Sequence, residues 1–186
     1  MPKLARQCPR HAAADERLPH RMLTERLELR PAVEADRTQM VPMWQDASFM
    51  EFSGGVMSAV EAEARFDRLV SFAAEVPFAK QPVIERSTGR IIGYSGVDTA
   101  DFEGQTWLEY GYRLIPEARA KGYATEAAQG LLALAEQTVT EPTTILAIID
   151  PRNEPSQNVA RKLGFAWWKI GFINGYWDSL WRLRLG

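Results

Sequence analysis

The sequence is poor in cysteine and histidine. Its single cysteine, Cys8, excludes a disulfide within the chain and any zinc finger built from cysteine pairs, and it suits a reducing compartment. Both histidines, His11 and His20, precede residue 21. The rest of the chain therefore offers no imidazole for a catalytic triad or a histidine metal site. We expect no metal centre, and proton transfer must use carboxylates, hydroxyls or water.

Long apolar runs are also missing. No uninterrupted stretch approaches the roughly 18 residues that a membrane span requires, and the longest runs are as short as residues 131–135. This excludes a transmembrane role, and together with the lone cysteine it favours a cytoplasmic protein. With 46% hydrophobic and 25% charged residues, the composition is that of a globular domain.

Charge is distributed unevenly along the 186 residues. Residues 1–21 carry a net charge of +3, so the remainder carries −5 of the chain's total of −2. An acidic body argues against binding to a nucleic-acid backbone, which needs clustered lysine and arginine. We expect residues 1–21 to form a disordered basic extension and residues 22–186 to form a single domain.

Strand and helix signals alternate from Leu27 to the end of the chain. The Asn174-Gly175 pair between aromatic residues predicts a terminal hairpin, and Gly164 is placed as a left-handed helix cap. Apolar spacing predicts helices over residues 33–44, 59–75, 124–137 and 154–163. Alternating or β-branched runs predict strands at 27–29, 83–84, 91–92, 107–115 and 143–149. This order indicates the α/β class, with a mixed sheet and helices on both of its faces.

One turn has the composition of a phosphate-binding segment. It reads Arg119-Ala120-Lys121-Gly122-Tyr123-Ala124-Thr125 and joins a predicted strand to a predicted helix. A helix N-terminus has unpaired backbone N–H groups and a partial positive charge, so a glycine-containing turn there can bind a phosphate. Gly122 lets the backbone approach, and Arg119, Lys121 and Thr125 are suitable partners. The segment is not a P-loop, and an ordinary strand-to-helix loop is the alternative.

The same turn carries a family resemblance. Arg119-x-x-Gly122-x-Ala124 resembles the Gln/Arg-x-x-Gly-x-Gly/Ala signature of the GNAT superfamily of N-acetyltransferases, whose loop binds the pyrophosphate of acetyl-CoA. Further motifs follow in the family's order over residues 23–185 and are similar to the ribosomal-protein N-terminal acetyltransferases of the RimJ and RimL type. These motifs are Thr24-Glu25-Arg26-Leu27-Glu28-Leu29-Arg30-Pro31, Leu108-Glu109-Tyr110-Gly111-Tyr112, Asn153-x-x-Ser156 with Lys162-Leu163-Gly164-Phe165, and Asn174-Gly175 with Asp178.

The chain departs from the family pattern at two positions. Ala120 stands where many relatives have glycine, which leaves an unbranched residue in the turn. Ala160 stands where other GNAT branches carry a tyrosine general acid. That acid is therefore missing here.

The resemblance implies the fold and the cofactor contacts. The fold would be a GNAT-type three-layer αβα arrangement (mixed α+β) around a mixed, mostly antiparallel sheet of about 6–7 strands. Acetyl-CoA would be the acetyl donor, with no metal. Its pyrophosphate would bind the turn, and its pantetheine would pair with backbone N–H groups where two strands splay. The implied cofactor-binding residues are Leu114, Ile115, Arg119, Lys121, Gly122, Tyr123, Ala124, Thr125, Asn153 and Ser156.

Two residues are candidates for catalysis. Glu109 lies on the strand that leads into the turn, where it would act as the base for the acceptor amine, directly or through a water. A surface or salt-bridged glutamate is the alternative. The Ser156 hydroxyl would hydrogen-bond the CoA sulfur or relay a proton to it, or would instead satisfy N–H groups of the first helical turn. Asn153 would cap that helix, contact the pantetheine, or do both.

The sequence thus predicts an acetyl-CoA-dependent N-acetyltransferase that acts by direct attack of a primary amine on the thioester. The acceptor would be a protein or peptide N-terminus or a small-molecule amine, bound between residues 46–58 and the terminal hairpin. A non-catalytic acyl-CoA-binding sensor or regulatory module is the alternative function. An exposed aromatic hairpin would also favour a homodimer.

Overall fold

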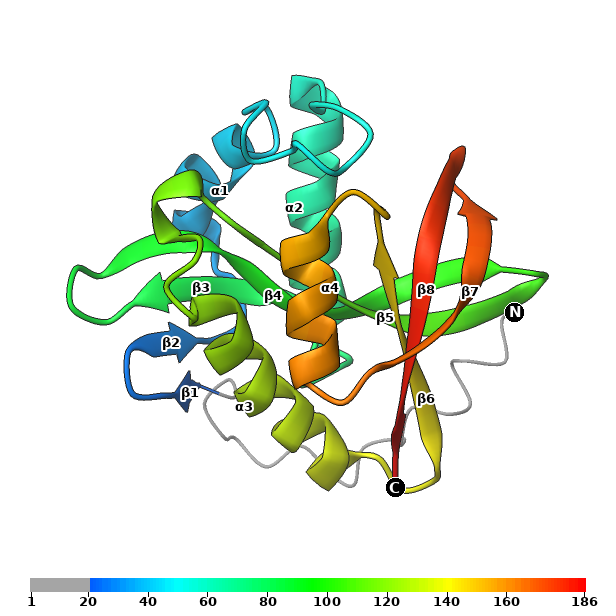
Figure 1. Cartoon of the computed structure of the whole chain (residues 1–186). Coiled ribbons are helices and arrows are strands. Elements are labelled where there is room, and N and C mark those ends of the chain that lie inside the picture. Colours follow the sequence, from blue (N-terminus) through cyan, green and yellow to red (C-terminus); the bar gives the residue numbers. More distant parts are fainter. Residues whose placement is uncertain (1–20) are drawn as a thin grey trace.

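The computed structural model describes residues 21–186 (Figure 1). The basic extension expected over residues 1–21 lies outside the described residues, apart from its last residue. The helices and strands occur in the predicted order, preceded by one short strand. They are β1 (Met22–Leu23), β2 (Leu27–Leu29), α1 (Arg37–Met43), α2 (Ala59–Ala73), β3 (Gln81–Glu85), β4 (Arg90–Phe102), β5 (Gln105–Leu114), α3 (Tyr123–Thr138), β6 (Thr143–Ile149), α4 (Glu154–Lys162), β7 (Ala166–Ile173) and β8 (Tyr176–Leu185).

The strands form one mixed sheet in the order β1-β2-β3-β4-β5-β6-β8-β7. Among the described strands, β5 and β6 run parallel and the other neighbours run antiparallel. The mixed, mostly antiparallel sheet is therefore confirmed. It has 8 strands rather than 6–7, because Met22 and Leu23 pair with Leu29 and Glu28 as an additional edge strand.

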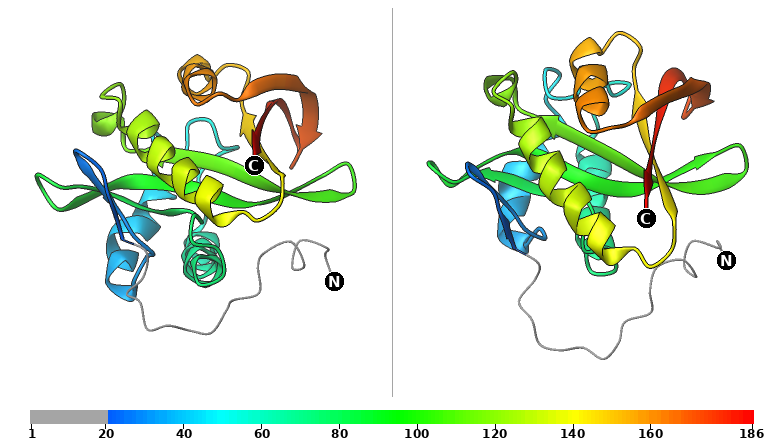
Figure 2. Two further views of the ribbon diagram at one scale, coloured as in Figure 1. Left: turned by 90° about the horizontal axis from the view of Figure 1, so that it is seen from below. Right: turned by 60° about the horizontal axis from the view of Figure 1, so that its bottom comes forward.

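Helices cover both faces of the sheet, which confirms the three-layer arrangement. Helices α1 and α2 lie on one face, and α3 and α4 lie on the other (Figure 2). Each long helix packs through an apolar stripe. In α2 the buried residues are Ala62, Phe66 and Leu69, and in α3 they are Tyr123, Ala127, Ala128, Leu131, Leu132 and Ala135. Such a stripe is what helical apolar spacing in the sequence predicts.

Two of the predicted turns have the expected backbone geometry. Gly164 follows α4 with φ of 86°, and Asn174 and Gly175 join β7 to β8 with φ of 52° and 89°. All three lie in the left-handed region that favours glycine and asparagine. The structure also contains a hairpin that was not predicted, where Glu103 and Gly104 connect the long strands β4 and β5.

The helix predicted over residues 33–44 is divided into a 3-10 turn, Glu34–Asp36, and α1. Within residues 21–186, no helix is long and apolar enough to cross a membrane.

The two parallel strands separate soon after they meet. Strands β5 and β6 pair only at Leu108 with Ile145 and at Glu109 with Leu146, although β5 continues to Leu114 and β6 to Ile149. Their diverging ends are visible in Figure 1. Beyond Glu109, the facing backbone edges therefore have hydrogen-bonding groups available to a ligand.

Candidate functional site

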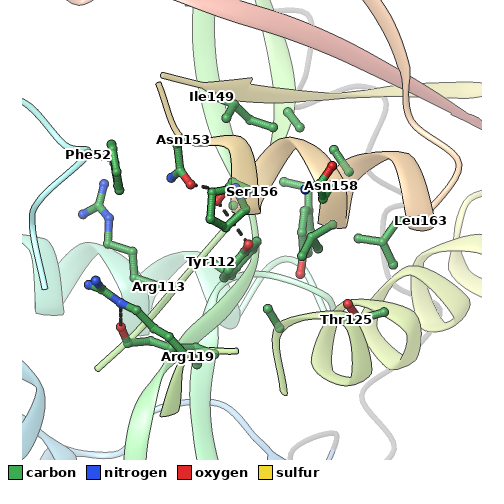
Figure 3. Close-up of a pocket in the computed structure, with 18 of the residues that line it drawn as sticks. Phe52, Tyr112, Arg113, Arg119, Thr125, Ile149, Asn153, Ser156, Asn158 and Leu163 are labelled. Carbon is green, nitrogen blue, oxygen red and sulfur yellow. Dashed lines mark hydrogen bonds between the residues drawn. The ribbon is translucent and has the colours of Figure 1, made fainter. Parts of the chain in front are cut away.

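A cavity of about 620 Å³ occupies the opening between β5 and β6 (Figure 3). Its walls come from β5, the turn before α3, the end of β6 and α4. The lining residues that matter for the chemistry are Glu109, Tyr112, Leu114, Arg119, Gly122, Tyr123, Ala124, Thr125, Asn153 and Ser156. Most of the residues predicted from the sequence are thus brought to one cavity. Ile115 and Lys121 are not among its lining residues.

The turn before α3 has the backbone geometry of an anion site. Gly122 is the N-cap residue with φ of 82°, and the first helical bond runs from the Glu126 N–H to the Gly122 carbonyl. The N–H groups of Tyr123, Ala124 and Thr125 precede that bond, so they have no partner within the helix. Together with the positive end of the helix dipole, they can bind a phosphate.

The side chains of Arg26 and Arg119 hold the turn in place. Arg26 donates from Nη1 to the Lys121 carbonyl at 2.9 Å and pairs with Glu126 at 2.7 Å. Arg119 donates from Nε to the Leu114 carbonyl at 3.2 Å and pairs with Glu51 at 3.0 Å. In this arrangement the Arg119 side chain fixes the turn to the loop after α1, while the backbone N–H groups face the cavity.

The strand β5 offers one of the two N–H groups expected from the sequence. The Ile115 N–H donates to the Ile92 carbonyl at 2.9 Å. It is therefore already paired with β4 and, contrary to expectation, is not available to a ligand. Because successive N–H groups along an antiparallel ladder point to opposite sides, those of Leu114 and Tyr112 point toward β6 and the opening. The splay that the resemblance implies is present, with Leu114 at its edge.

The start of α4 joins three polar side chains across the cavity (Figure 3). Asn153 caps the helix, with its Oδ1 accepting from the Ser156 N–H at 3.1 Å. The Ser156 hydroxyl does not cap the helix. It lies 3.1 Å from the Tyr112 hydroxyl, within hydrogen-bonding distance. Burial raises the pKa of Tyr112, while the hydrogen bond with Ser156 opposes that rise. Tyr112 is therefore protonated at neutral pH and can donate to Ser156.

Glu109 lies at the inner end of the opening, where the two strands are still paired. Its Oε2 accepts from Lys80 Nζ at 2.7 Å, and both side chains are mostly buried. Glu109 is therefore a salt-bridged residue, as the alternative interpretation of the sequence has it, and it also lines the cavity. No described residue donates to the other oxygen, Oε1. Gly111 makes room for this pair, since a Cβ there would lie 2.7 Å from Glu109 Oε1 and 3.4 Å from Lys80 Nζ.

A second cavity of about 950 Å³ adjoins the first. It lies between the loop after α1 and the tip of the β7–β8 hairpin, as the sequence predicts for an acceptor pocket. Its lining includes residues 51–55 and Asn174, Tyr176, Trp177 and Asp178. The two cavities share Glu51, Phe52, Ser53, Lys80, Glu109, Arg113, Ile148 and Asp150. Glu109 thus stands where a ligand in one cavity would meet a ligand in the other.

Sequence reasoning missed three polar residues of this site: Lys80, Tyr112 and Arg113. Tyr112 was visible within the Leu108–Tyr112 motif, and its alternation with Glu109 places it on the other face of β5. Its partner Ser156 is 44 residues away. Lys80 carried no local signal, because it precedes β3 and reaches Glu109 only through the fold.

The arrangement combines an anion site, an open strand edge and a set of proton donors and acceptors. A nucleotide-like ligand could bind its phosphates at the turn and extend an amide-bearing arm along Leu114 toward Asn153 and Ser156. A carboxylate stands beside the adjoining cavity. This is the layout that acyl transfer from a thioester to an amine requires.

Comparison with known proteins identifies the family. Residues 26–166 match the family model described as Acetyltransferase (GNAT) domain. The chain therefore belongs to the GNAT family of acetyltransferases, enzymes that use acetyl-CoA.

Individual relatives agree with this assignment. The uncharacterized N-acetyltransferase YnaD of Bacillus subtilis (strain 168) is 29% identical over 164 residues, which cover 84% of this chain and 91% of the relative. A GnaT-family acetyltransferase of Bordetella pertussis has a similar structure, with a TM-score of 0.76, 21% identity and coverage of 88% of this chain and 98% of its own. The ribosomal-protein-S5-alanine acetyltransferase of Vibrio fischeri has a TM-score of 0.68 at 19% identity, over 88% of this chain and 94% of its own. The two structures show likeness of fold.

Proposed function

We propose that residues 22–186 transfer the acetyl group of acetyl-CoA to a primary amine by direct attack on the thioester. The observation that carries this proposal is the junction of the two cavities at Glu109. One cavity has an anion site and an open strand edge for the acetyl donor. The other leads to the same carboxylate from the acceptor side.

The acetyl donor would bind along the first cavity. Its pyrophosphate would accept hydrogen bonds from the N–H groups of Tyr123, Ala124 and Thr125. Its pantetheine would pair with the backbone of Leu114, and its thioester would lie beside Ser156. The Lys121 side chain lies outside the cavity lining, so we assign its contribution to the backbone of the turn and to long-range attraction.

Glu109 would accept the proton that the attacking amine loses, directly or through a water. Lys80 fixes the carboxylate through Oε2, and no described residue donates to Oε1. An amine that enters from the second cavity would therefore give its proton to Oε1. Lys80 acts here as a positioning residue, because it contacts Glu109 rather than a substrate.

Ser156 would protonate the departing sulfur. Tyr112 lies within hydrogen-bonding distance of Ser156 and can replace the proton that the serine gives up. The chain carries Ala160 at the position of the tyrosine acid of other branches, and Tyr112 supplies a phenol from β5 instead. Solvent then returns a proton to Tyr112 and takes one from Glu109, so both groups regain their starting protonation states before the next turnover.

The second part of the proposal concerns the class of the acceptor amine. The motifs from Thr24 to Asp178 are similar to those of ribosomal-protein N-terminal acetyltransferases. The Vibrio fischeri neighbour is described as acting on an alanine of ribosomal protein S5. A protein N-terminus and a small-molecule amine are both compatible with a cavity of about 950 Å³.

The direct test is release of free thiol from acetyl-CoA in the presence of pooled amines, N-terminal peptides and amino sugars, with mass spectrometry of the products. We expect acceptor-dependent thiol release and a product heavier by one acetyl group. If acetyl-CoA raises the melting temperature but no pool member is acetylated, catalysis by this site is contradicted for those acceptor classes. If acetyl-CoA does not bind, the whole assignment fails.

A further inference from the structure

Arg113 is an unpaired cation at the boundary of the two cavities. Its Nη1 lies 3.0 Å from the thioether sulfur of Met50, and its guanidinium lies 6.0 Å from the centre of the Tyr94 ring. Neither contact neutralises a charge. Among residues 21–186, no carboxylate lies within salt-bridge distance of Arg113. Figure 3 shows its side chain extending from β5 toward Phe52.

Two other cations that line the second cavity already have partners. Lys80 pairs with Glu109 at 2.7 Å, and Arg65 pairs with Asp98 at 3.1 Å. The charge that remains uncompensated there is that of Arg113. The surroundings of Tyr94 agree with this: burial alone would raise the pKa of the Tyr94 phenol, but Arg113, Lys80 and Arg65 together hold its pKa below the ordinary value. Arg113 therefore brings to this cavity a positive charge that no described carboxylate pairs with.

The second cavity is also lined by an acid that has no described cation partner. Asp178 comes from β8 and is half-buried, and no described cation lies within salt-bridge distance of it. Burial raises its pKa, and the neighbouring Asp150 carboxylate raises it further. Asp150 follows β6 and begins the loop that leads to Asn153 and α4. An ammonium group held by Asp178 would thus lie near Asp150, beyond the end of β6.

We propose that the acceptor is a small zwitterionic amine of the α-amino acid class, whose carboxylate or other anionic group binds Arg113 and whose amine binds at Asp178. This inference rests on the proposed function and names the substrate class of its second cavity. The planar guanidinium can hold a carboxylate through two parallel hydrogen bonds. An acceptor with a neutral carbonyl at that point would leave the partly buried Arg113 without a counter-ion, which is unfavourable.

A contact between the β7–β8 hairpin and the loop after α1 is a second reason to expect a small acceptor rather than a long chain. The Tyr176 hydroxyl donates to the Gly54 carbonyl at 3.2 Å and so connects the hairpin tip to the loop after α1. Gly54 allows this close approach, because a Cβ there would lie 2.7 Å from the Tyr176 hydroxyl oxygen. The contact joins two segments that line the second cavity. We expect a small acceptor, rather than a polypeptide chain, to leave this contact intact.

The experiment compares matched acceptors in the thiol-release assay. Four pools are used: the common free amino acids, the same amino acids as amides, amines that lack the carboxylate, and short peptides with neutral side chains. We expect the free amino acids to be acetylated with a kcat/KM at least about tenfold above that of their amides, as an ion pair in a partly buried site predicts.

Variants then assign the preference to Arg113. Arg113→Gln should raise KM for the best amino acid about tenfold or more and leave KM for acetyl-CoA unchanged, and Arg113→Lys should restore part of the loss because the charge is kept and the paired geometry is not. Asp178→Asn should also raise KM for the amino acid. Arg90→Gln, which removes an exposed cation at the distant start of β4, is the matched control.

The outcomes separate the two proposals. If amides, peptides or simple amines are acetylated as well as free amino acids, the inference is wrong and the acetyltransferase proposal stands. The same holds if Arg113→Gln leaves the preference unchanged, or if it raises KM for acetyl-CoA to the same extent. If no pool releases thiol, the proposed function fails first. Folding of each variant is checked by its acetyl-CoA-dependent rise in melting temperature.

Discussion

The hydroxyl oxygen of Tyr112 lies 3.1 Å from the hydroxyl oxygen of Ser156. The two residues come from different sides of the opening, Tyr112 from the middle of β5 and Ser156 from the first turn of α4. The serine N–H is already bound by Asn153, so its hydroxyl is free to face both the tyrosine and a ligand. In the proposed mechanism, this pair would provide the protonated oxygen that a departing thiolate needs.

Tyr112→Phe should lower kcat by about tenfold, because the serine loses the donor that restores its proton. Ser156→Ala should lower kcat at least as much. The double variant should be no slower than Ser156→Ala, since the two hydroxyls act in one relay. Steady-state kinetics with thiol detection measures all three. Additive losses in the double variant would show that the two hydroxyls act separately.

Glu109→Gln should lower kcat by about a hundredfold, the lower range for loss of a general base, and leave the Kd of acetyl-CoA nearly unchanged. Glu141→Gln, at an exposed loop position, is the matched control and should be as active as the wild type. Rates and calorimetric titration with acetyl-CoA give the two quantities. An equal loss of cofactor affinity would indicate that Glu109 supports the cavity rather than the proton transfer.

Ala120→Gly should stabilise the protein by about 1 kcal/mol, because Ala120 has φ of 59°, a left-handed conformation that costs an alanine more than a glycine. The matched control is Ala74→Gly at the exposed end of α2, where φ of −70° is ordinary for alanine. There the same substitution should destabilise by about 0.5–1 kcal/mol. Urea unfolding of both variants measures the difference. If Ala120→Gly lowers the free energy of unfolding, the backbone of Ala120 is not strained.

Asp98 should make stability depend on pH. Burial alone would raise its pKa, but Lys80, the hydrogen bond from Arg68 and the nearby Arg65 together hold the pKa below its ordinary value. The folded state therefore releases this proton more readily than the unfolded chain. The stabilisation is present above the unfolded pKa of about 3.9 and is lost as pH falls through the lower folded pKa.

Asp98→Asn should accordingly be less stable than the wild type at pH 7, and the difference should shrink at acidic pH, where the wild-type carboxyl is protonated as well. Urea unfolding of both proteins across this range provides the measurement. A difference that stays constant with pH would mean that the contacts of Asp98 do not depend on its charge.

Much of the fold could be predicted because it depends on local patterns. The 3.6-residue apolar spacing of residues 124–137 predicted α3 almost to its ends, and Asn174-Gly175 predicted the last hairpin. The strand β1 was missed, because two residues carry too little periodicity to indicate a strand. The turn at Glu103 and Gly104 was also missed, because long strands continue on both sides of it.

The candidate site likewise contains some residues that are contiguous in sequence and others that only the fold brings together. The turn around Gly122 could be found because its chemistry is contiguous in sequence. The pairs Lys80 with Glu109 and Tyr112 with Ser156 could not, because they join residues 29 and 44 positions apart through the register of the sheet and the docking of α4. The pairing of the Ile115 N–H with Ile92 also depends on register, so sequence alone could not tell it from the N–H of Leu114.

We propose that the opening between β5 and β6 binds acetyl-CoA with its sulfur beside Ser156 and Tyr112. A crystal structure of the protein with CoA would show where the cofactor binds. We predict that the pyrophosphate accepts hydrogen bonds from the N–H groups of Tyr123, Ala124 and Thr125, and that the sulfur lies within hydrogen-bonding reach of the Ser156 hydroxyl. A pyrophosphate bound elsewhere, or a sulfur directed away from Ser156, would contradict the account.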